Sequence, residues 1–214
     1  MEYGVEDLKR EIRIAIDQNM TSTQLSELGD VDTLSLDDII ESKVAPAARI
    51  VEQIAPAYLL DSGRAFAETI SWKSQEGFGM GYVQLPDDFL RLVTFQMSDW
   101  DYAATVPITE QDPLYEQQHS RYPGIRGCPQ KPIVALVQQP IGLVLEFYSC
   151  SAGSGVYVKR ARYIPIPRIV DDKIELCEKL KPSIIYYAAY LTALSVGDKE
   201  LAESMLNNSK EFLQ

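Results

Sequence analysis

Residues 81–92 read GYVQLPDDFLRL, and they mark the point where a helical sequence gives way to a β-forming one. Residues 81–85 have the composition of a strand, residues 86–88 form a turn, and residues 89–97 alternate as a second strand. The pattern predicts a β-hairpin. We expect Phe89 to anchor the resulting sheet to the helices.

Three further strands are predicted at residues 133–137, 142–148 and 156–163. Polar or small residues at 138–140 and 151–155 supply the turns between them. Together with the hairpin they give an antiparallel sheet of about five strands, the usual size.

Two segments between these strands have characters of their own. Residues 98–101 form a polar tip that carries Trp100, whose indole we expect to be exposed. Residues 109–119 form a short helix, for which Thr109 is the expected N-cap.

The chain before the β region is helical. Apolar residues recur every three or four positions over residues 5–20, and a polar loop follows at 21–33. A hydroxyl followed three residues later by a carboxylate, at residues 35–38, is typical of a capping box. It begins a second helix that extends to Ile54, and Pro46 should kink or split that helix.

The chain after the β region is helical again. Apolar residues are helix-spaced from Ile174 to Val196, with Pro182 as the expected break and Gly197 as the stop. A last helix is marked by apolar residues between Leu201 and Phe212.

This order predicts an α+β protein. A helical bundle built from both chain ends would carry an inserted antiparallel β-sheet domain, because neither end is long enough to be stable alone. The expected boundaries are residues 1–74 for the N-terminal helices, 75–168 for the β domain and 169–214 for the C-terminal helices, all in one compact unit.

Charge is unevenly distributed along the 214 residues. The chain has 20 basic and 31 acidic residues, a net charge of −11, which excludes a general nucleic-acid binder. Residues 120–170, however, hold 7 basic residues and 1 acidic residue. This asymmetry favours a polarised surface for acidic partners or neighbouring copies. The alternative is that these cations scatter over a solvated sheet face.

No set of residues in the sequence indicates a catalytic site. With three separated cysteines and one histidine, the sequence excludes a structural zinc site, and no apolar run is long enough to span a membrane. The glycines of residues 77–81 precede a strand, so they do not form a dinucleotide site. One alternative stays open, a cysteine-dependent hydrolase that uses Cys128 and His119. Adjacent carboxylates such as Asp87-Asp88 are typical of caps and loop tips.

The tyrosine-rich segment around Tyr186, Tyr187 and Tyr190 is either an interface or a helix packed on the sheet. The candidate interface residues are six cations and three aromatic residues, namely Arg121, Arg126, Lys131, Lys159, Arg160, Arg162, Tyr186, Tyr190 and Trp100.

The phrase LPDDFLRL at residues 85–92 resembles a strand–turn–strand motif of the head–tail connector proteins (adaptor or neck proteins) of tailed bacteriophages. Residues 38–56 are similar to the long N-terminal helix of that family, residues 109–115 to the segment after its first hairpin, and residues 180–213, with IYYAAYLTAL, to its closing helices. Residues 54–63 also resemble ring proteins of crAss-like phages. The basic stretch and Pro46 depart from the family pattern.

The resemblance implies a virion structural protein rather than an enzyme. Such a protein would form a ring of about twelve copies between portal and tail, and DNA would pass through it during packaging and ejection. The implied partners are copies of the same chain, the portal protein and further neck or tail proteins, with DNA only as passing cargo. No cofactor, metal or membrane is implied. The expected location is the head–tail junction of the virion. Before assembly we expect the chain in the host cytoplasm.

Overall fold

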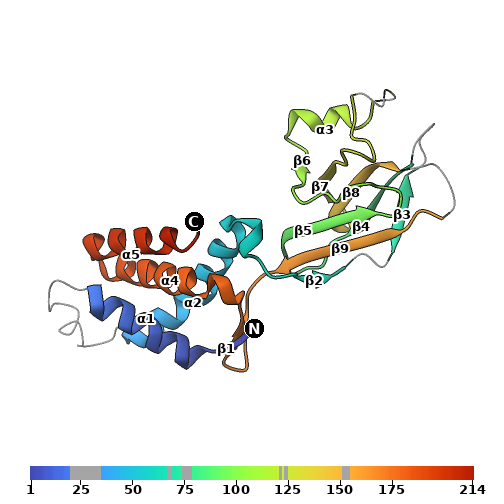
Figure 1. Ribbon diagram of the computed structural model, residues 1–214. Helices are drawn as coiled ribbons and strands as arrows, with labels where there is room; N and C mark the ends of the chain where they lie inside the picture. The colour runs from blue at the N-terminus through green and yellow to red at the C-terminus, as the bar shows by residue number, and fades with distance from the viewer. Residues whose placement is uncertain (20–34, 67–68, 74–78, 121, 123–124, 151–154) are drawn as a thin grey trace. The chain divides into compact units, whose positions relative to one another are not determined.

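The computed structural model describes residues 1–214 except 20–34, 67–68, 74–78, 121, 123–124 and 151–154. The described residues form five α-helices and three sheets, which confirms the mixed α+β class. The chain divides into two compact units (Figure 1). The helical unit comprises residues 1–61 and 166–214, and the β unit comprises residues 62–165.

The helical unit contains four α-helices, three short strands and two 3₁₀ turns among its described residues. In chain order they are β1 (Glu2–Gly4), α1 (Val5–Asn19), α2 (Leu36–Ile54), η2 (Ala57–Leu59), β10 (Ile169–Val170), β11 (Lys173–Glu175), η3 (Glu178–Leu180), α4 (Lys181–Val196) and α5 (Lys199–Glu211). The predicted loop at residues 21–33 lies outside the described residues.

Local sequence signals account for α2. The Ser35 hydroxyl accepts a hydrogen bond from the Asp38 N–H at 3.2 Å, and the Asp38 carboxylate accepts one from the Ser35 N–H at 3.1 Å. The predicted capping box is thus confirmed. The expected split at Pro46 is wrong, because α2 continues through it. Pro46 is exposed, so water can solvate the carbonyl that loses its partner.

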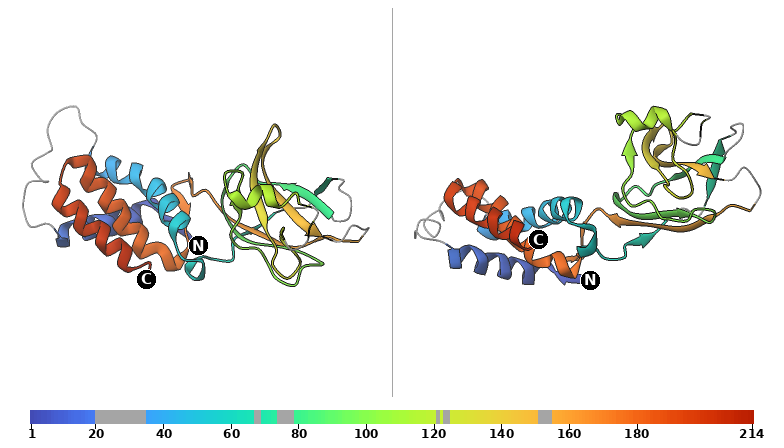
Figure 2. Two further views of the ribbon diagram at one scale, coloured as in Figure 1. Left: turned by 90° about the horizontal axis from the view of Figure 1, so that it is seen from above. Right: turned by 45° about the horizontal axis from the view of Figure 1, so that its top comes forward.

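Helices α4 and α5 lie side by side in both views of Figure 2. Pro182 falls in the first turn of α4, where its missing N–H costs nothing, so it begins the helix instead of breaking it. Gly197 ends α4 with φ 86°, a left-handed conformation that favours glycine, as predicted. Asp198 then caps α5 by accepting from the Leu201 N–H at 3.0 Å.

The core of the helical unit is aliphatic and rich in alanine. It draws on all four helices and on the small sheet, with Leu8, Ile12, Ile40, Val44, Ala47, Val51, Ile174, Leu176, Ile184, Ala188, Leu201 and Met205 among its buried members. Alanine at the helix contacts allows close approach of the helix axes.

A three-stranded sheet, β1-β11-β10, completes this unit and was not predicted. Ile174 and Leu176 were assigned to a helix because their spacing fits a helix as well as a strand. In the structure Ile174 pairs with Tyr3, so the first residues of the chain add an edge strand. Asp171 and Asp172 form the turn between β10 and β11 with φ of 49° and 57°.

The β unit contains eight strands and one short helix among its described residues. They are β2 (Arg64–Ala65), β3 (Ile70–Lys73), β4 (Gly79–Gln84), β5 (Phe89–Met97), β6 (Ile108–Thr109), α3 (Pro113–Gln117), β7 (Val134–Gln139), β8 (Gly142–Cys150) and β9 (Val158–Pro165).

These strands make two sheets instead of the expected single one. One sheet has the order β2-β9-β5, and the other has the order β3-β4-β8-β7-β6. The predicted hairpin is therefore wrong in its pairing, because β4 pairs with β3 and β8 whereas β5 pairs with β9. The turn after Leu85 carries the chain from one sheet to the other.

Aromatic rings fill the core of the β unit. Phe95 is completely buried and stacks on Phe147 with ring centroids 5.8 Å apart. Phe89 lies at the margin of the same core, stacked on Tyr163 at 5.9 Å. Phe89 thus packs against the core of the β unit.

The five-stranded sheet is covered on its second face as well. Buried Met80, Val137, Val144 and Tyr148 form a small cluster there, against which Tyr115 of α3 packs. Asp112, not Thr109, caps α3, and its carboxylate accepts from the Leu114 N–H at 2.8 Å. Thr109 instead pairs with Leu136 in the sheet. Helix α3 begins late because Pro113 is favoured only in a first turn.

One glycine in this sheet is required by packing. Gly81 pairs with Trp72, and a Cβ at Gly81 would lie 2.7 Å from the Phe147 ring. The absent side chain leaves room for Trp72 to meet the Phe147 ring edge-on, at 5.4 Å.

Candidate functional site

The predicted cationic surface separates into distinct groups in the structure. Lys159, Arg160 and Arg162 lie on β9 and are exposed, as is Lys131 in a tight turn. Arg126 is half-buried, and desolvation lowers the pKa of its guanidinium. Arg121 lies outside the described residues.

The register of the sheet β2-β9-β5 decides which cations share a face. Ala161 and Tyr163 point into the core, so Arg160 and Arg162 point to the opposite, outer face. Their neighbours on β5 are Gln96 and Thr94. Arg91 stands opposite Ile164 on the same side of the sheet, and Ile164 and Gln96 are only 5% and 6% exposed, so part of this side is covered.

This outer face, which we call the arginine face, consists of Arg91, Arg160 and Arg162. Arg162 donates hydrogen bonds to the carbonyls of Gly63 at 3.0 Å and Ser62 at 3.4 Å, which hold its guanidinium beside β2. Arg91 is half-buried, and desolvation lowers the pKa of its guanidinium. Arg160 makes no ion pair with any described residue.

Charge differs sharply between the two units. The helical unit has 11 basic and 21 acidic residues, a net charge of −10, and the β unit has 9 basic and 10 acidic residues, a net charge of −1. The sequence showed a basic stretch, but the contrast between whole units required knowing which residues fold together.

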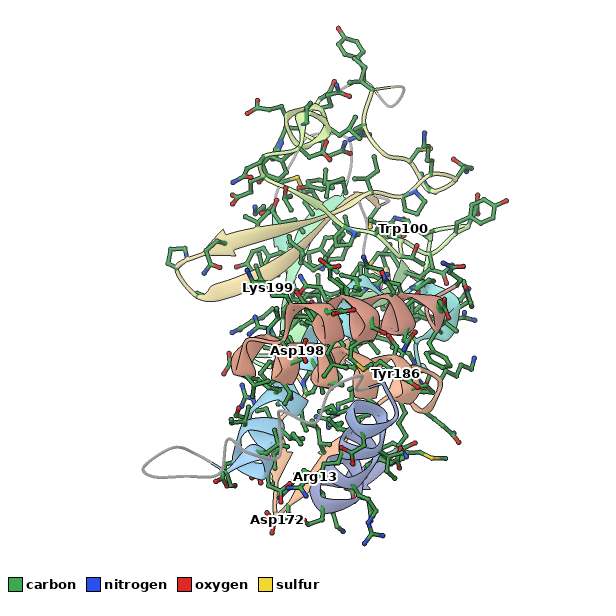
Figure 3. The ribbon with its side chains drawn as sticks, turned by 90° about the vertical axis from the view of Figure 1, so that its left-hand side faces the viewer. Arg13, Trp100, Asp172, Tyr186, Asp198 and Lys199 are labelled. Atoms are coloured by element: carbon green, nitrogen blue, oxygen red, sulfur yellow. The ribbon has the colours of Figure 1, made fainter. Side chains whose placement is uncertain are left out.

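The tyrosines of α4 are engaged within the chain. Tyr186, labelled in Figure 3, stacks on Phe212 with ring centroids 5.6 Å apart. Tyr190 meets Tyr187 edge-on at 5.3 Å. Both candidate residues are half-buried against the core of the helical unit. These contacts lie within the helical unit, whereas the alternative to an interface was a helix packed on the sheet.

The expectation of an exposed indole at Trp100 is wrong. Trp100 is 3% exposed and packs edge-on against Phe95 at 5.8 Å. Its carbonyl accepts a hydrogen bond from the buried Gln96 amide at 3.0 Å, and Ala104 pairs with Phe95 to close the loop. The polar residues on either side of Trp100 led to the prediction of exposure, but the large apolar area of the indole favours burial.

Cys128 and His119 are brought near each other along the backbone. The buried Gln118 side chain accepts from the Gly127 N–H at 2.9 Å, so the residues adjacent to both are joined. The exposed His119 ring lies edge-on to Tyr115 and Tyr148. Within the described part of the chain, no hydrogen bond links Cys128 to His119 and no carboxylate orients the imidazole.

A buried glutamate in the β unit was missed by sequence reasoning. Glu146 on β8 is 1% exposed, and its carboxylate accepts from Tyr148 at 2.9 Å, Gln139 at 3.2 Å and Tyr115 at 3.4 Å. Lys73 completes the set with an ion pair. The signal was present as the single acidic residue of residues 120–170, inside an otherwise apolar strand.

A second buried glutamate lies in the helical unit. Glu52 on α2 is 4% exposed, and its carboxylate accepts from the Cys177 N–H at 3.3 Å. Burial raises the pKa of Glu52 from 4.5 to about 7, and the negative charges of Asp61 and Glu175 add to that effect.

The remaining chemistry is limited in the part of the chain that the structure describes. No group of three or more His, Cys, Asp or Glu side chains there is arranged to hold a metal ion. None of the helices described combines the length and the apolar character needed to cross a bilayer.

Comparison with known proteins yields no family. No protein-family model matches the chain, and no curated protein matches it significantly.

Proposed function

We propose that this chain is a non-catalytic virion protein that forms a ring in the head–tail connector of a tailed phage, between portal and tail. In this proposal about twelve copies enclose a conduit for DNA during packaging and ejection. The portal and the neighbouring neck or tail proteins are the other partners. In this proposal the chain is in the host cytoplasm before assembly and at the head–tail junction afterwards.

The observation that carries the proposal is the division of the chain into an acidic helical unit and a β unit of nearly neutral net charge that exposes cations. We propose that the helices form a bundle built from both chain ends, into which the β domain is inserted; its strand pairs are antiparallel except for the parallel pair β6–β7. Exposed cations on one unit and an excess of acidic residues on the other favour head-to-tail contacts between copies, and such contacts close into rings when the rotation per subunit fits.

The resemblance of residues 81–92 to the connector family supports the same proposal, because these residues form strand β4, a turn and strand β5. Strands β4 and β5 do not pair with each other, but the order strand, turn, strand along the chain is the same as in the motif.

The proposal is tested in particles of the phage that encodes the chain. An antibody against the chain should label the head–tail junction, and quantitative mass spectrometry should give about twelve copies per particle. Cys128→Ser and His119→Ala should leave assembly and infectivity unchanged. Absence of the chain from purified particles overturns the proposal, as does loss of infectivity in these variants with normal assembly.

A further inference from the structure

The end of α2 and the segment that follows it have little apolar burial of their own. Among residues 53–61, all of which the structure describes, Ala55 alone is buried, and the others are exposed or half-buried. Asp61 is the last residue of this part of the helical unit, and the chain passes from it into the β unit. We call residues 55–61 the connecting segment. Its attachment to the helical unit depends strongly on polar contacts, because so few of its side chains are buried.

Cys177 supplies two of these polar contacts. Its N–H donates to the Glu52 carboxylate at 3.3 Å, and its thiol donates to the Leu59 carbonyl at 3.0 Å. The ammonium group of Lys179 adds a third contact, to the Tyr58 carbonyl at 3.3 Å. The turn between β11 and α4 thus holds both the end of α2 and the connecting segment.

Glu52 is the buried ionisable group at this junction. Its side chain is 4% exposed, and the carboxylates of Asp61 and Glu175 and the amino group of Met1 act on it from the neighbouring elements. Burial is the largest effect and raises the pKa of Glu52 to about 7, although the hydrogen bond from Cys177 favours the ionised form. Above this pH the junction holds an ionised Glu52 together with two other carboxylates.

Two further groups at the junction stay neutral over the same pH range. Burial is the largest effect on Tyr3 and on Cys177, and it raises the pKa of both above ordinary values that already lie well above neutral pH. The charges of Glu178 and Lys181 also act on the Tyr3 hydroxyl, with opposite signs. Neither the hydroxyl nor the thiol therefore competes with Glu52 as the group that changes charge near neutral pH.

We infer that the connecting segment is a pH-dependent switch, attached while Glu52 carries a proton and detached when Glu52 is ionised. Detachment hydrates the carboxylate and separates it from Asp61 and Glu175, and both changes favour the charged form. The attached state binds the proton more tightly, so the detached state gains population as pH rises through neutrality. The chain between α2 and the β unit then becomes a longer tether. The switch operates in the isolated chain and does not require the proposed ring.

Alkylation of Cys177 measures the switch, because its thiol is buried against Leu59 in the attached state. The full chain is treated with iodoacetamide at about pH 5.5 and about pH 7.5, and mass spectrometry resolves the Cys177 adduct from those of Cys128 and Cys150. Each rate is divided by the rate of the urea-unfolded chain at the same pH, which removes the effect of thiol ionisation. The protection of Cys177 should fall about twentyfold, since the pKa of Glu52 is 4.5 when it is exposed and about 7 when it is buried.

Glu52→Gln is the decisive variant. Its amide oxygen can still accept from the Cys177 N–H but the side chain cannot ionise, so protection should be independent of pH and higher than in the wild-type chain at about pH 7.5. The variant keeps the Met1 amino group and the other carboxylates, so a fall that persists in it comes from them and overturns the inference. An unchanged protection of wild-type Cys177 between the two pH values also overturns it. Glu200→Gln, at an exposed position of α5, is the matched control and should retain the wild-type fall.

Hydrogen exchange separates detachment of the segment from opening of the whole helical unit. The amides of Leu59 and Cys177 report the junction, and those of Ala188 and Ala189 report the interior of α4. At about pH 7.5 the junction amides should be at least about tenfold less protected than the α4 amides, because local opening leaves α4 folded. Equal protection of the two groups would show that Cys177 becomes accessible only when the helical unit unfolds, and it would overturn the switch.

Discussion

Each of the two units buries a glutamate, and the surroundings of the two carboxylates differ. Glu146 in the β unit meets a lysine, two tyrosine hydroxyls and an amide. Glu52 in the helical unit accepts a backbone N–H and lies near two more carboxylates, which raise its pKa together with burial. A buried carboxylate is tolerated beside a cation, whereas burial near other carboxylates favours its protonated form.

The cores differ in a similar way. The β unit depends on a few large rings, whereas the helical unit distributes its burial over many small and aliphatic side chains. Both tryptophans, Trp72 and Trp100, belong to the β unit, so tryptophan fluorescence reports that unit, and far-ultraviolet circular dichroism reports mainly the helices.

The largest effect is expected from Phe95→Ala. Phe95 is fully buried and touches the rings of Phe66, Trp100 and Phe147, so its truncation should cost about 3–5 kcal/mol. The fluorescence transition in thermal unfolding should move down more than the dichroism transition. Phe89→Ala, at the margin of the core, is the control with a smaller expected shift. Equal shifts in both signals would mean that the two units unfold as one.

The next effect is a pH dependence in the helical unit. Between pH 4.5 and about 7 native Glu52 keeps a proton that the unfolded chain releases, so its contribution to stability falls as pH rises through this window and is constant above it. Glu52→Gln should therefore stabilise the chain by up to about 3 kcal/mol above pH 7 and by little near pH 4. Urea denaturation followed by dichroism at several pH values measures the difference. Glu200→Gln, on the exposed side of α5, should show no such trend, and a trend of equal size there would refute the assignment.

The same substitution should have the opposite sign in the β unit. Glu146→Gln weakens charge-assisted hydrogen bonds to Tyr148 and Lys73, and it should destabilise the chain by about 2 kcal/mol. Tryptophan fluorescence in urea is the measurement. A stabilising Glu146→Gln would show that the network does not offset the cost of burying the carboxylate.

The smallest effect is expected at a helix end. Ser35→Ala removes one half of the capping box of α2 and should cost about 1 kcal/mol, seen in the dichroism transition. Ser42→Ala, at an exposed position of the same helix, is the control. No difference between the two variants would mean that the cap contributes nothing beyond the packing of α2.

The sequence predicted what local signals encode. The cap at Ser35, the stop at Gly197 and the ranges of most helices follow from residues close to one another along the chain. Strand pairing does not, since the partner of Phe89 is Pro165 and the partner of Tyr3 is Ile174. The hairpin was predicted because the turn after Leu85 looks the same whether its strands pair with each other or not.

The candidate interface residues show the same difference between local signals and long-range pairing. The cations of β9 were visible in the sequence, but their grouping with Arg91 depends on the register between β5 and β9. Trp100 was misplaced because burial depends on a loop that closes through Ala104, and polar neighbours give no sign of that closure.

Strands β2 and β9 are hydrogen-bonded neighbours, with Arg64 opposite Tyr163 and Ala65 opposite Arg162. The chain therefore enters and leaves the β unit at almost the same point, since paired strands lie about 5 Å apart. A unit whose two ends lie next to each other can be inserted into another domain as a single piece. It can be gained, lost or exchanged during evolution without rethreading its host, because a short turn joining Asp61 to Ile166 would restore a continuous helical chain.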